Sequence, residues 1–469
     1  MKSVKIDQKS TDLFSNTVSK TIGEKLGIAD DLQPVNVSSI GFFPYHYLVE
    51  NDFYYPSWRY INHAVEPSKK SKRLEFGDPL SERFENYVNR LCYELSDSDA
   101  ETLEKCQKNL ADTGDKLISL YEHKYKKITS SKLEDAGVET KIDYITSYKL
   151  MQWAGDELKL DDDVLKDLWS YLKEAPNSAK ELVPLLTQYL NGLLPVAGLV
   201  NTLNAATWKL GKVRRNLDKP GEENGGLYTQ DEDGKYWVPR FTVDKKPDTI
   251  HEELGNSGNT VTITAKFTDF SGSKSRLEVE GQAGGTVSLP SLFSVSAKGS
   301  AKYSLHQLSS KASSCEMAVE YSGFTTVAFS PSDFVSGRGW FTTAEIKDAV
   351  DNGDDDKVSG WVLKPYPRDG GITYPSYLAI SQFPTIRITY TSGSLSTKVQ
   401  KWQTGTKVEV RLLGIPLAET SHDYQVTKIE SHGEDKGFTL TLGPTLHDDL
   451  LKQDRRVFVI GAGVKKIEI

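Results

Sequence analysis

Residues 261 to 280, VTITAKFTDFSGSKSRLEVE, decide the fold class of the second half of the chain. Apolar side chains occupy every second position of the first run, at Val261, Ile263, Ala265 and Phe267. A period of two is typical of a strand with one buried face, and short runs divided by Gly, Ser, Asp and Pro turns favour an antiparallel sandwich or barrel. The same pattern predicts later strands at Thr385–Tyr390, Lys407–Leu412, Phe438–Leu442 and Arg456–Ile460.

Upstream of this region the apolar period is helical. Ser98 to Glu101 fits a capping box, and apolar residues then recur at helical spacing from Leu103 to Tyr121. Two further helices are predicted, one at Lys141–Leu158 and one from the acidic cluster at Asp161 to Pro176. Short connections between them indicate an antiparallel helical bundle.

The chain is therefore predicted to be an α+β protein, with a helical bundle domain followed by antiparallel β-sandwich-like domains. Its 469 residues are too many for one ordinary core. The predicted segments are an irregular aromatic-rich segment at 1–95, a helical domain at 96–215, a linker at 216–245, a β domain with a long amphipathic hairpin at 246–345, and a C-terminal β domain at 346–469.

One run inside the helical region carries no charge: LVPLLTQYLNGLLPVAGLVNTLNAATW, 27 residues from Leu182 to Trp208. A helix that spans a bilayer needs about 20 apolar residues, so the length is sufficient. Pro195 and the polar residues within the run argue against one stable span. Two interpretations remain open: a buried helical hairpin that turns at residues 194–198, or a hairpin that inserts into a membrane under some conditions.

Composition and the N-terminus restrict the partners and the compartment. The net charge of −8 and the pI near 5.7 argue against nucleic acid as a partner. The three cysteines match no metal or disulfide framework. The first 20 residues contain no apolar core of a signal peptide, so we expect synthesis in the cytoplasm and, for any export, lysis or an injection machinery.

Motifs of enzymes are absent from the sequence. It contains no GxxxxGK[ST] phosphate loop, no GxSxG nucleophile elbow and no HExxH zinc motif. The acidic loop Asp354–Asp356 has carboxylates that could bind a hard cation, but it lacks the spacing of a calcium loop. We therefore predict a protein that is not an enzyme, with no cofactor and no resident metal.

The segment from Thr286 to Tyr321 indicates a function, because two arms in it alternate weakly apolar residues with serine and charged residues. A strand of a membrane barrel needs about 9 to 11 residues with an apolar outer face. Small apolar and polar residues would keep such arms soluble before assembly. The apolar faces of the two arms consist of Phe293, Val295, Ala297, Gly299, Ala301, Tyr303, Leu305, Met317, Val319 and Tyr321.

Over residues 260–329 this alternation resembles the amphipathic hairpins of β-pore-forming proteins of the aerolysin and perforin kinds. The resemblance implies a soluble monomer that forms homo-oligomers on a lipid membrane and threads hairpins into a barrel. An ordinary hairpin at the edge of a β-sheet would show the same alternation.

The sequence thus favours a non-enzymatic membrane-interacting or pore-forming toxin or effector, which acts through the amphipathic β-hairpin and oligomerisation. The alternative is a structural or surface-binding protein that assembles through pairing of β-sheet edges, without insertion into a membrane.

Overall fold

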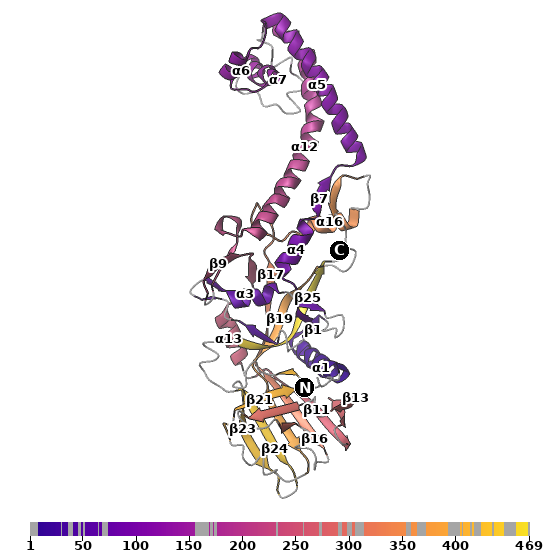
Figure 1. Cartoon of the computed structure of the whole chain (residues 1–469), viewed down its shortest axis with the longest axis vertical. Coiled ribbons are helices and arrows are strands. Elements are labelled where there is room, and N and C mark those ends of the chain that lie inside the picture. Colours follow the sequence, from indigo (N-terminus) through magenta and orange to yellow (C-terminus); the bar gives the residue numbers. More distant parts are fainter. Residues whose placement is uncertain are drawn as a thin grey trace. The chain divides into compact units, whose positions relative to one another are not determined.

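Figure 1 shows the computed structural model, in which helices and almost entirely antiparallel sheets confirm the α+β class. The structure describes residues 8–29, 31–35, 41–45, 48–49, 52–63, 65–67, 74–154, 168, 172, 176–230, 233–256, 258–271, 274–288, 293–297, 303–304, 314–352, 358–363, 372–392, 404–405, 407–412, 415–416, 424–433, 436–444 and 456–467.

The chain forms two compact units. Unit 1 contains residues 1–89, 212–343 and 367–469, and unit 2 contains residues 90–211 and 344–366. Each unit is therefore built from chain segments that are distant in sequence. The prediction of five consecutive segments missed this arrangement, because periodicity describes local structure and carries no information about which segments share a core.

Unit 1 contains an eleven-stranded sheet with the order β13-β12-β11-β16-β20-β24-β23-β21-β14-β15, in which β22 also pairs with β21. All of its strand pairs are antiparallel. Its strands are β11 (Thr260–Ser271), β12 (Lys274–Val279), β13 (Gln282–Ser288), β14 (Phe293–Ala297), β15 (Tyr303–Ser304), β16 (Cys315–Ser322), β20 (Thr385–Tyr390), β21 (Lys407–Leu412), β22 (Ile415–Pro416), β23 (Tyr424–Ser431) and β24 (Phe438–Pro444).

A six-stranded sheet has the order β1-β25-β19-β17-β10, with β2 also paired to β25. It comprises β1 (Leu32–Pro34), β2 (Phe42–Pro44), β10 (Phe241–Val243), β17 (Phe324–Pro331), β19 (Ile372–Ser381) and β25 (Arg456–Ile467). Two small sheets of unit 1 comprise β3 (Leu48–Val49), β4 (Asp52–Tyr54), β8 (Leu227–Gln230), β9 (Lys235–Val238), β5 (Val65–Pro67) and β6 (Leu74–Phe76). The strands predicted near residues 385, 407, 438 and 456 are confirmed.

The first 95 residues are not irregular, contrary to the prediction. Helix α1 (Gln8–Leu26) places Phe14, Val18 and Ile22 at intervals of four residues in the same core as the strands of the large sheet. The helix is missed from sequence because serine, threonine and lysine fill most of its other positions. The remaining helices of unit 1 are α3 (Tyr55–Asn62), α4 (Leu80–Val88) and α13 (Pro247–Gly255).

The predicted linker at 216–245 is ordered structure. It contains the 3₁₀ helix η2 (Glu222–Asn224) and strands β8, β9 and β10. The buried side chain of Asn224 accepts a hydrogen bond from the Gly221 amide at 2.7 Å and donates one to the Lys219 carbonyl at 2.8 Å. The Asn224 side chain thus satisfies the backbone amide of Gly221 and the backbone carbonyl of Lys219, on either side of Pro220.

Unit 2 contains two long helices, α5 (Asp97–Tyr125) and α12 (Val183–Asp218), the second of which ends in unit 1. The two helices run antiparallel, since Gly114 approaches Tyr189 while Leu110 approaches Gly192. The other elements of unit 2 are β7 (Leu91–Glu94), α6 (Ser130–Ala136), α7 (Lys141–Asp143), the π-helix η1 (Tyr144–Lys149), α8 (Leu150–Ala154), α11 (Asn177–Lys180), α16 (Ala344–Asn352) and β18 (Gly360–Leu363).

The N-cap of helix α5 lies two residues before the N-cap predicted at Ser98. Its N-cap is Ser96, whose hydroxyl accepts a hydrogen bond from the Asp99 amide at 3.1 Å. Gly114, in the middle of the helix, is buried where a Cβ atom would lie 3.2 Å from the Tyr189 ring. This glycine therefore permits the close approach of α12.

Of the predicted second helix, the structure describes α7, η1 and α8 as one continuous helical run. Of the predicted third helix, the described residues are Leu168 and Leu172, both buried in the core of unit 2. The cluster Asp161–Asp163 lies outside the described residues.

Helix α12 corrects the prediction of a helical hairpin. The chain continues through Pro195 as one helix of 36 residues and does not turn at residues 194–198. Proline removes the hydrogen bond to the carbonyl of Asn191, but both residues are exposed, so water can reach that carbonyl.

Candidate functional site

The two predicted hairpin arms do not pair with each other, which corrects the expectation of a single hairpin. The first arm forms β14 and β15, which pair with each other, and β14 also pairs with β21. The second arm forms β16, which lies between β11 and β20. Between these two arms in the sheet lie β20, β24, β23 and β21.

The second arm is enclosed on its apolar face. Met317 is paired with Ala265 and Ile388, and Val319 is paired with Ile263 and Ile386. All of these side chains are at most 1% exposed, and Tyr321 is 2% exposed. Met317, Val319 and Tyr321, which the sequence predicted to meet lipid or a second subunit, therefore lie in the core of unit 1.

Cys315, at the start of β16, is also closed off from solvent, and this burial changes the acidity of its thiol. Its thiol is fully buried beside β20, where it is paired with Tyr390. Burial raises the pKa of Cys315 to about 12. The thiolate is thus strongly disfavoured in the folded protein.

The first arm is described in part. Phe293, Val295 and Ala297 belong to β14 and Tyr303 belongs to β15, at one end of the described sheet. Gly299, Ala301 and Leu305 lie outside the described residues, as does the acidic loop Asp354–Asp356.

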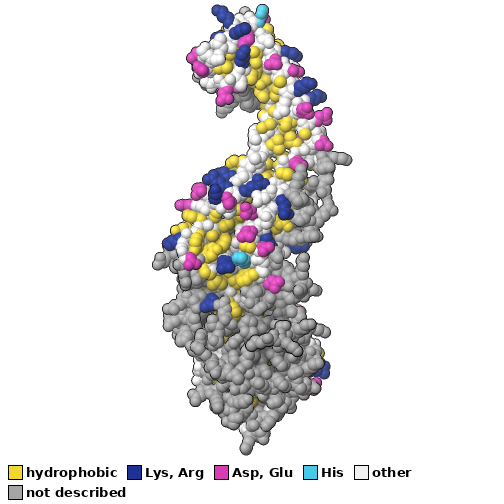
Figure 2. Space-filling view, in the orientation of Figure 1, with side chains coloured by type: hydrophobic (Ala, Val, Ile, Leu, Met, Phe, Trp, Pro, Cys, Tyr) yellow, Lys and Arg dark blue, Asp and Glu magenta, His cyan; other side chains and the backbone are white. Residues whose placement is uncertain are grey.

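The uncharged run of α12 has the opposite environment to β16. Among the residues that the structure describes, α12 is the helix that is long and apolar enough to cross a membrane, and 17% of its most apolar 18-residue window is buried. Leu194 is 42% exposed and Trp208 is 54% exposed. Figure 2 shows hydrophobic side chains open to view along the two long helices of unit 2.

The two halves of the run differ in their packing. The first half belongs to the core of unit 2, through Leu182, Val183, Leu186 and Leu190. From Leu194 to Trp208, Ala206 is the one fully buried residue. This second half therefore presents apolar surface in the folded protein.

Five of the ten exposed residues of this second half follow a regular spacing. Steps of four, three, four and three residues keep side chains on one face of a helix. Large apolar residues stand at both ends of this face and smaller residues between them. The face consists of Leu194, Gly198, Asn201, Ala205 and Trp208, and we call it the α12 stripe.

Basic residues follow the stripe at the end of α12, within unit 1. Arg215 and Lys219 are exposed, and Lys212 is half-buried. The sequence analysis placed Lys212 and Arg215 in the helical domain and Lys219 in the linker, and it gave none of them a role, although their spacing continues that of the stripe.

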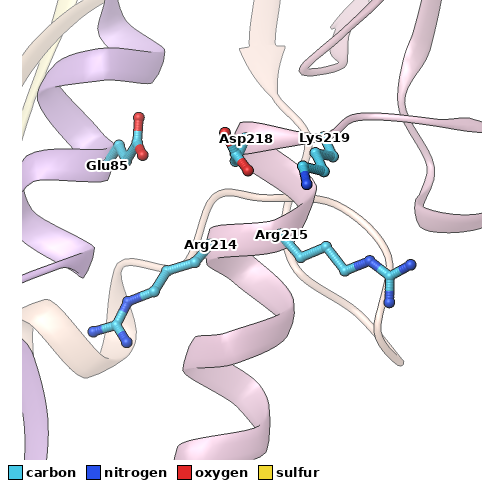
Figure 3. Close-up of a pocket in the computed structure, with 5 residues that line it drawn as sticks. All are labelled: Glu85, Arg214, Arg215, Asp218 and Lys219. Atoms are coloured by element: carbon cyan, nitrogen blue, oxygen red, sulfur yellow. The ribbon is translucent and has the colours of Figure 1, made fainter.

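A pocket of about 450 Å³ lies beside this helix end, lined by Glu85, Arg214, Arg215, Asp218 and Lys219. Figure 3 shows that the side chains of Arg214 and Arg215 leave the helix in different directions. The Arg214 guanidinium donates a hydrogen bond to the Val88 carbonyl at 3.0 Å, which ties the end of α12 to α4. The cations do not converge on one point, so the pocket is not built for a single compact anion.

A second polar cluster in unit 1 has a structural role. Lys245 donates hydrogen bonds to Glu253 at 2.7 Å and to Thr325 at 2.8 Å, and the Thr325 hydroxyl donates to Glu253. Burial acts to raise the pKa of Glu253, but the hydrogen bonds from Lys245 and Thr325 outweigh it and lower the pKa. The cluster thus joins α13 to β17 as a satisfied ion pair.

Comparisons with known proteins identify no relative. No family model, no curated protein and no solved structure matches the chain. Within the described residues, no group of three or more His, Cys, Asp or Glu side chains is arranged to hold a metal ion.

Proposed function

We propose that this protein is a non-enzymatic, membrane-interacting protein of the toxin or effector kind, which contacts lipid through the α12 stripe and acts as an oligomer. The observation that carries the proposal is the exposure of Leu194 and Trp208 on a helix with no charge between Val183 and Trp208. This face is therefore apolar at both ends and uncharged between them, and exposed apolar side chains gathered on one face are typical of a binding surface.

The composition of the stripe favours a bilayer. Burying a large apolar side chain contributes about 1.5–3 kcal/mol, so the two large residues together supply useful binding energy. Tryptophan is enriched where membranes meet water, and the basic residues that follow Trp208 fit the adjacent headgroup layer. The order along the helix is thus apolar, aromatic and basic.

The packing of α12 favours contact along the membrane surface over a span. The exposed part from Leu194 to Trp208 extends about 21 Å at 1.5 Å per residue, less than the roughly 30 Å of a hydrocarbon core. A span would have to recruit the first half of the run, which would leave the core around Leu186 and Leu190. Contact through the folded stripe requires no such unfolding.

The first β arm supports the oligomerisation part of the proposal. The strands β14 and β15 lie at one end of the described sheet, whereas β16 would have to break its pairing with both β11 and β20 to move. A strand at the end of a sheet has backbone groups that another chain can pair with.

Flotation with phosphatidylcholine–phosphatidylglycerol vesicles tests the proposal. The wild-type protein should float, and Ala205→Glu should lower the bound fraction at least about tenfold because it places a charge on the lipid face. Gln107→Glu is the matched control, since Gln107 is an exposed residue of α5 and gains the same charge. Absence of the wild-type protein from the floating fraction, or equal flotation of both variants, would contradict the proposal.

The second candidate is a structural or surface-binding protein that assembles by edge pairing of a β-sandwich, without a membrane. The observation that favours it is the same end position of β14 and β15. Electron microscopy and size-exclusion chromatography in the absence of lipid distinguish the two functions. Ordered oligomers that form without vesicles, together with no flotation, would support this second candidate.

A further inference from the structure

Three basic side chains share one face at the end of α12. Lys212, Arg215 and Lys219 are separated by three and four residues, and the Lys219 amide donates a hydrogen bond to the Arg215 carbonyl at 2.8 Å, which continues the helical pattern. Trp208 precedes Lys212 by four residues, one helical turn. The helix therefore orders its exposed side chains from apolar to aromatic to basic.

These three cations have no partner for their side chains in the part of the chain that the structure describes. No described residue accepts a hydrogen bond or forms an ion pair with the side chain of Lys212, Arg215 or Lys219. Figure 3 shows the guanidinium of Arg215 directed away from Glu85. Asp218 is the acidic neighbour within the same turn, and Glu85 lines the same pocket as Arg215 and Lys219. Glu222 and Glu223 follow Lys219 by three and four residues.

We propose that Lys212, Arg215 and Lys219 bind the headgroups of anionic phospholipids, so that the partner surface is a negatively charged bilayer. This inference rests on the proposed membrane function and gives it a lipid class. Basic residues close to an anionic membrane surface each contribute about fivefold in affinity. Three of them predict a preference for anionic over neutral vesicles on the order of a hundredfold.

Because the whole chain is negatively charged, its binding to an anionic membrane requires that basic side chains be clustered. At −8 the protein would be repelled from an anionic surface if its charges were spread evenly. Salt at about 0.15 M screens charges beyond roughly 8 Å, so the side chains nearest the lipid dominate. The carboxylates beside the three cations, Asp218 and Glu85, then oppose the attraction more than distant carboxylates do.

Co-sedimentation with vesicles tests the lipid class. Binding is measured to phosphatidylcholine vesicles with and without phosphatidylglycerol, at 150 mM and 500 mM salt. The variant Lys212→Gln/Arg215→Gln/Lys219→Gln should lose most of the anionic preference and most of the salt dependence. Asp218→Asn should raise the preference several-fold, which supplies a readout that loss of folding cannot mimic.

The matched control is Lys105→Gln/Lys116→Gln/Lys347→Gln, which removes the same charge from exposed lysines outside the cluster and should keep the preference. Equal binding of the wild-type protein to neutral and anionic vesicles, or an equal loss in both triple variants, would overturn this inference and leave the membrane function intact. No binding to either vesicle would overturn both.

Discussion

The middle of α12 and the strand β16 are both weakly apolar, and the sequence of each is compatible with contact to a membrane. The structure places them in opposite environments. In β16, the side chains of Met317 and Val319 are fully buried. In α12, Leu194 is 42% exposed and Trp208 is 54% exposed. Apolar character alone therefore does not identify a membrane-contact segment.

The difference follows from how each element satisfies its backbone. A strand needs neighbours for its N–H and C=O groups, and the neighbours of β16 are β11 and β20, each with its own apolar face. A helix forms its backbone hydrogen bonds internally, so it can extend beyond its core with one face open. The apolar face of a helix can thus stay exposed where the apolar face of a strand becomes enclosed.

The largest expected effect concerns the reactivity of Cys315. With a pKa of about 12 against an ordinary 9, the thiolate fraction at pH 8 is about a thousandfold lower than in a free cysteine. Maleimide labelling, followed by peptide mass spectrometry, should therefore leave Cys315 unmodified while an introduced Ala205→Cys thiol in α12 reacts readily.

The pH dependence of this thiol has a defined sign. Because the pKa is raised on folding, the neutral thiol stabilises the folded state below pH 9, and this stability is lost as the pH rises from about 9 to about 12. Protection should therefore persist at pH 8 and weaken above pH 9. Rapid labelling of Cys315 at pH 8 would mean that β16 leaves the sheet in the resting protein.

The next effect concerns truncation of one apolar side chain in each region. Met317→Ala should lower the free energy of unfolding by about 2–5 kcal/mol, because it leaves a cavity in the closed core. Leu194→Ala should change it by less than about 1 kcal/mol, because much of that side chain is already hydrated. Urea denaturation followed by circular dichroism measures both, and equal losses would erase the contrast between the regions.

The smallest effect concerns one glycine in each region. Gly198→Ala should raise the free energy of unfolding by about 0.5–1 kcal/mol, since alanine favours the helix and no atom lies within 4 Å of the added Cβ. Gly323→Ala, after β16, should destabilise the protein, because the Cβ would lie 1.8 Å from the Leu254 carbonyl oxygen at a φ of +53°. Thermal unfolding distinguishes the two, and a loss of stability in Gly198→Ala would show that the α12 stripe is covered.

The strands were the most predictable part of the fold. Alternation at Val261 to Phe267 and at Thr385 to Tyr390 identified β11 and β20, because a period of two depends on local sequence. The helical start at Ser96 was missed by two residues, since Ser98 offers an equally good cap in sequence. Helix α1 was missed because its three core residues become significant only against the sheet that covers them.

The functional site was predicted less well than the fold. The uncharged run of α12 stood out in the sequence, but Pro195 suggested a turn that does not exist. The arms around residue 300 were expected to pair with each other, and four strands separate them in the sheet. Which strand pairs with which depends on contacts across more than a hundred residues of chain, which local pattern does not encode.

By itself, the sequence determined the α+β class, the alternation of the strands and the lack of charge from Leu182 to Trp208, since each is a property of neighbouring residues. Only the tertiary structure decided that β16 lies inside a sheet and that α12 is one helix with exposed apolar residues. The exposure of a residue depends on which other segments pack against it, and that packing is determined by contacts between residues that are distant in sequence.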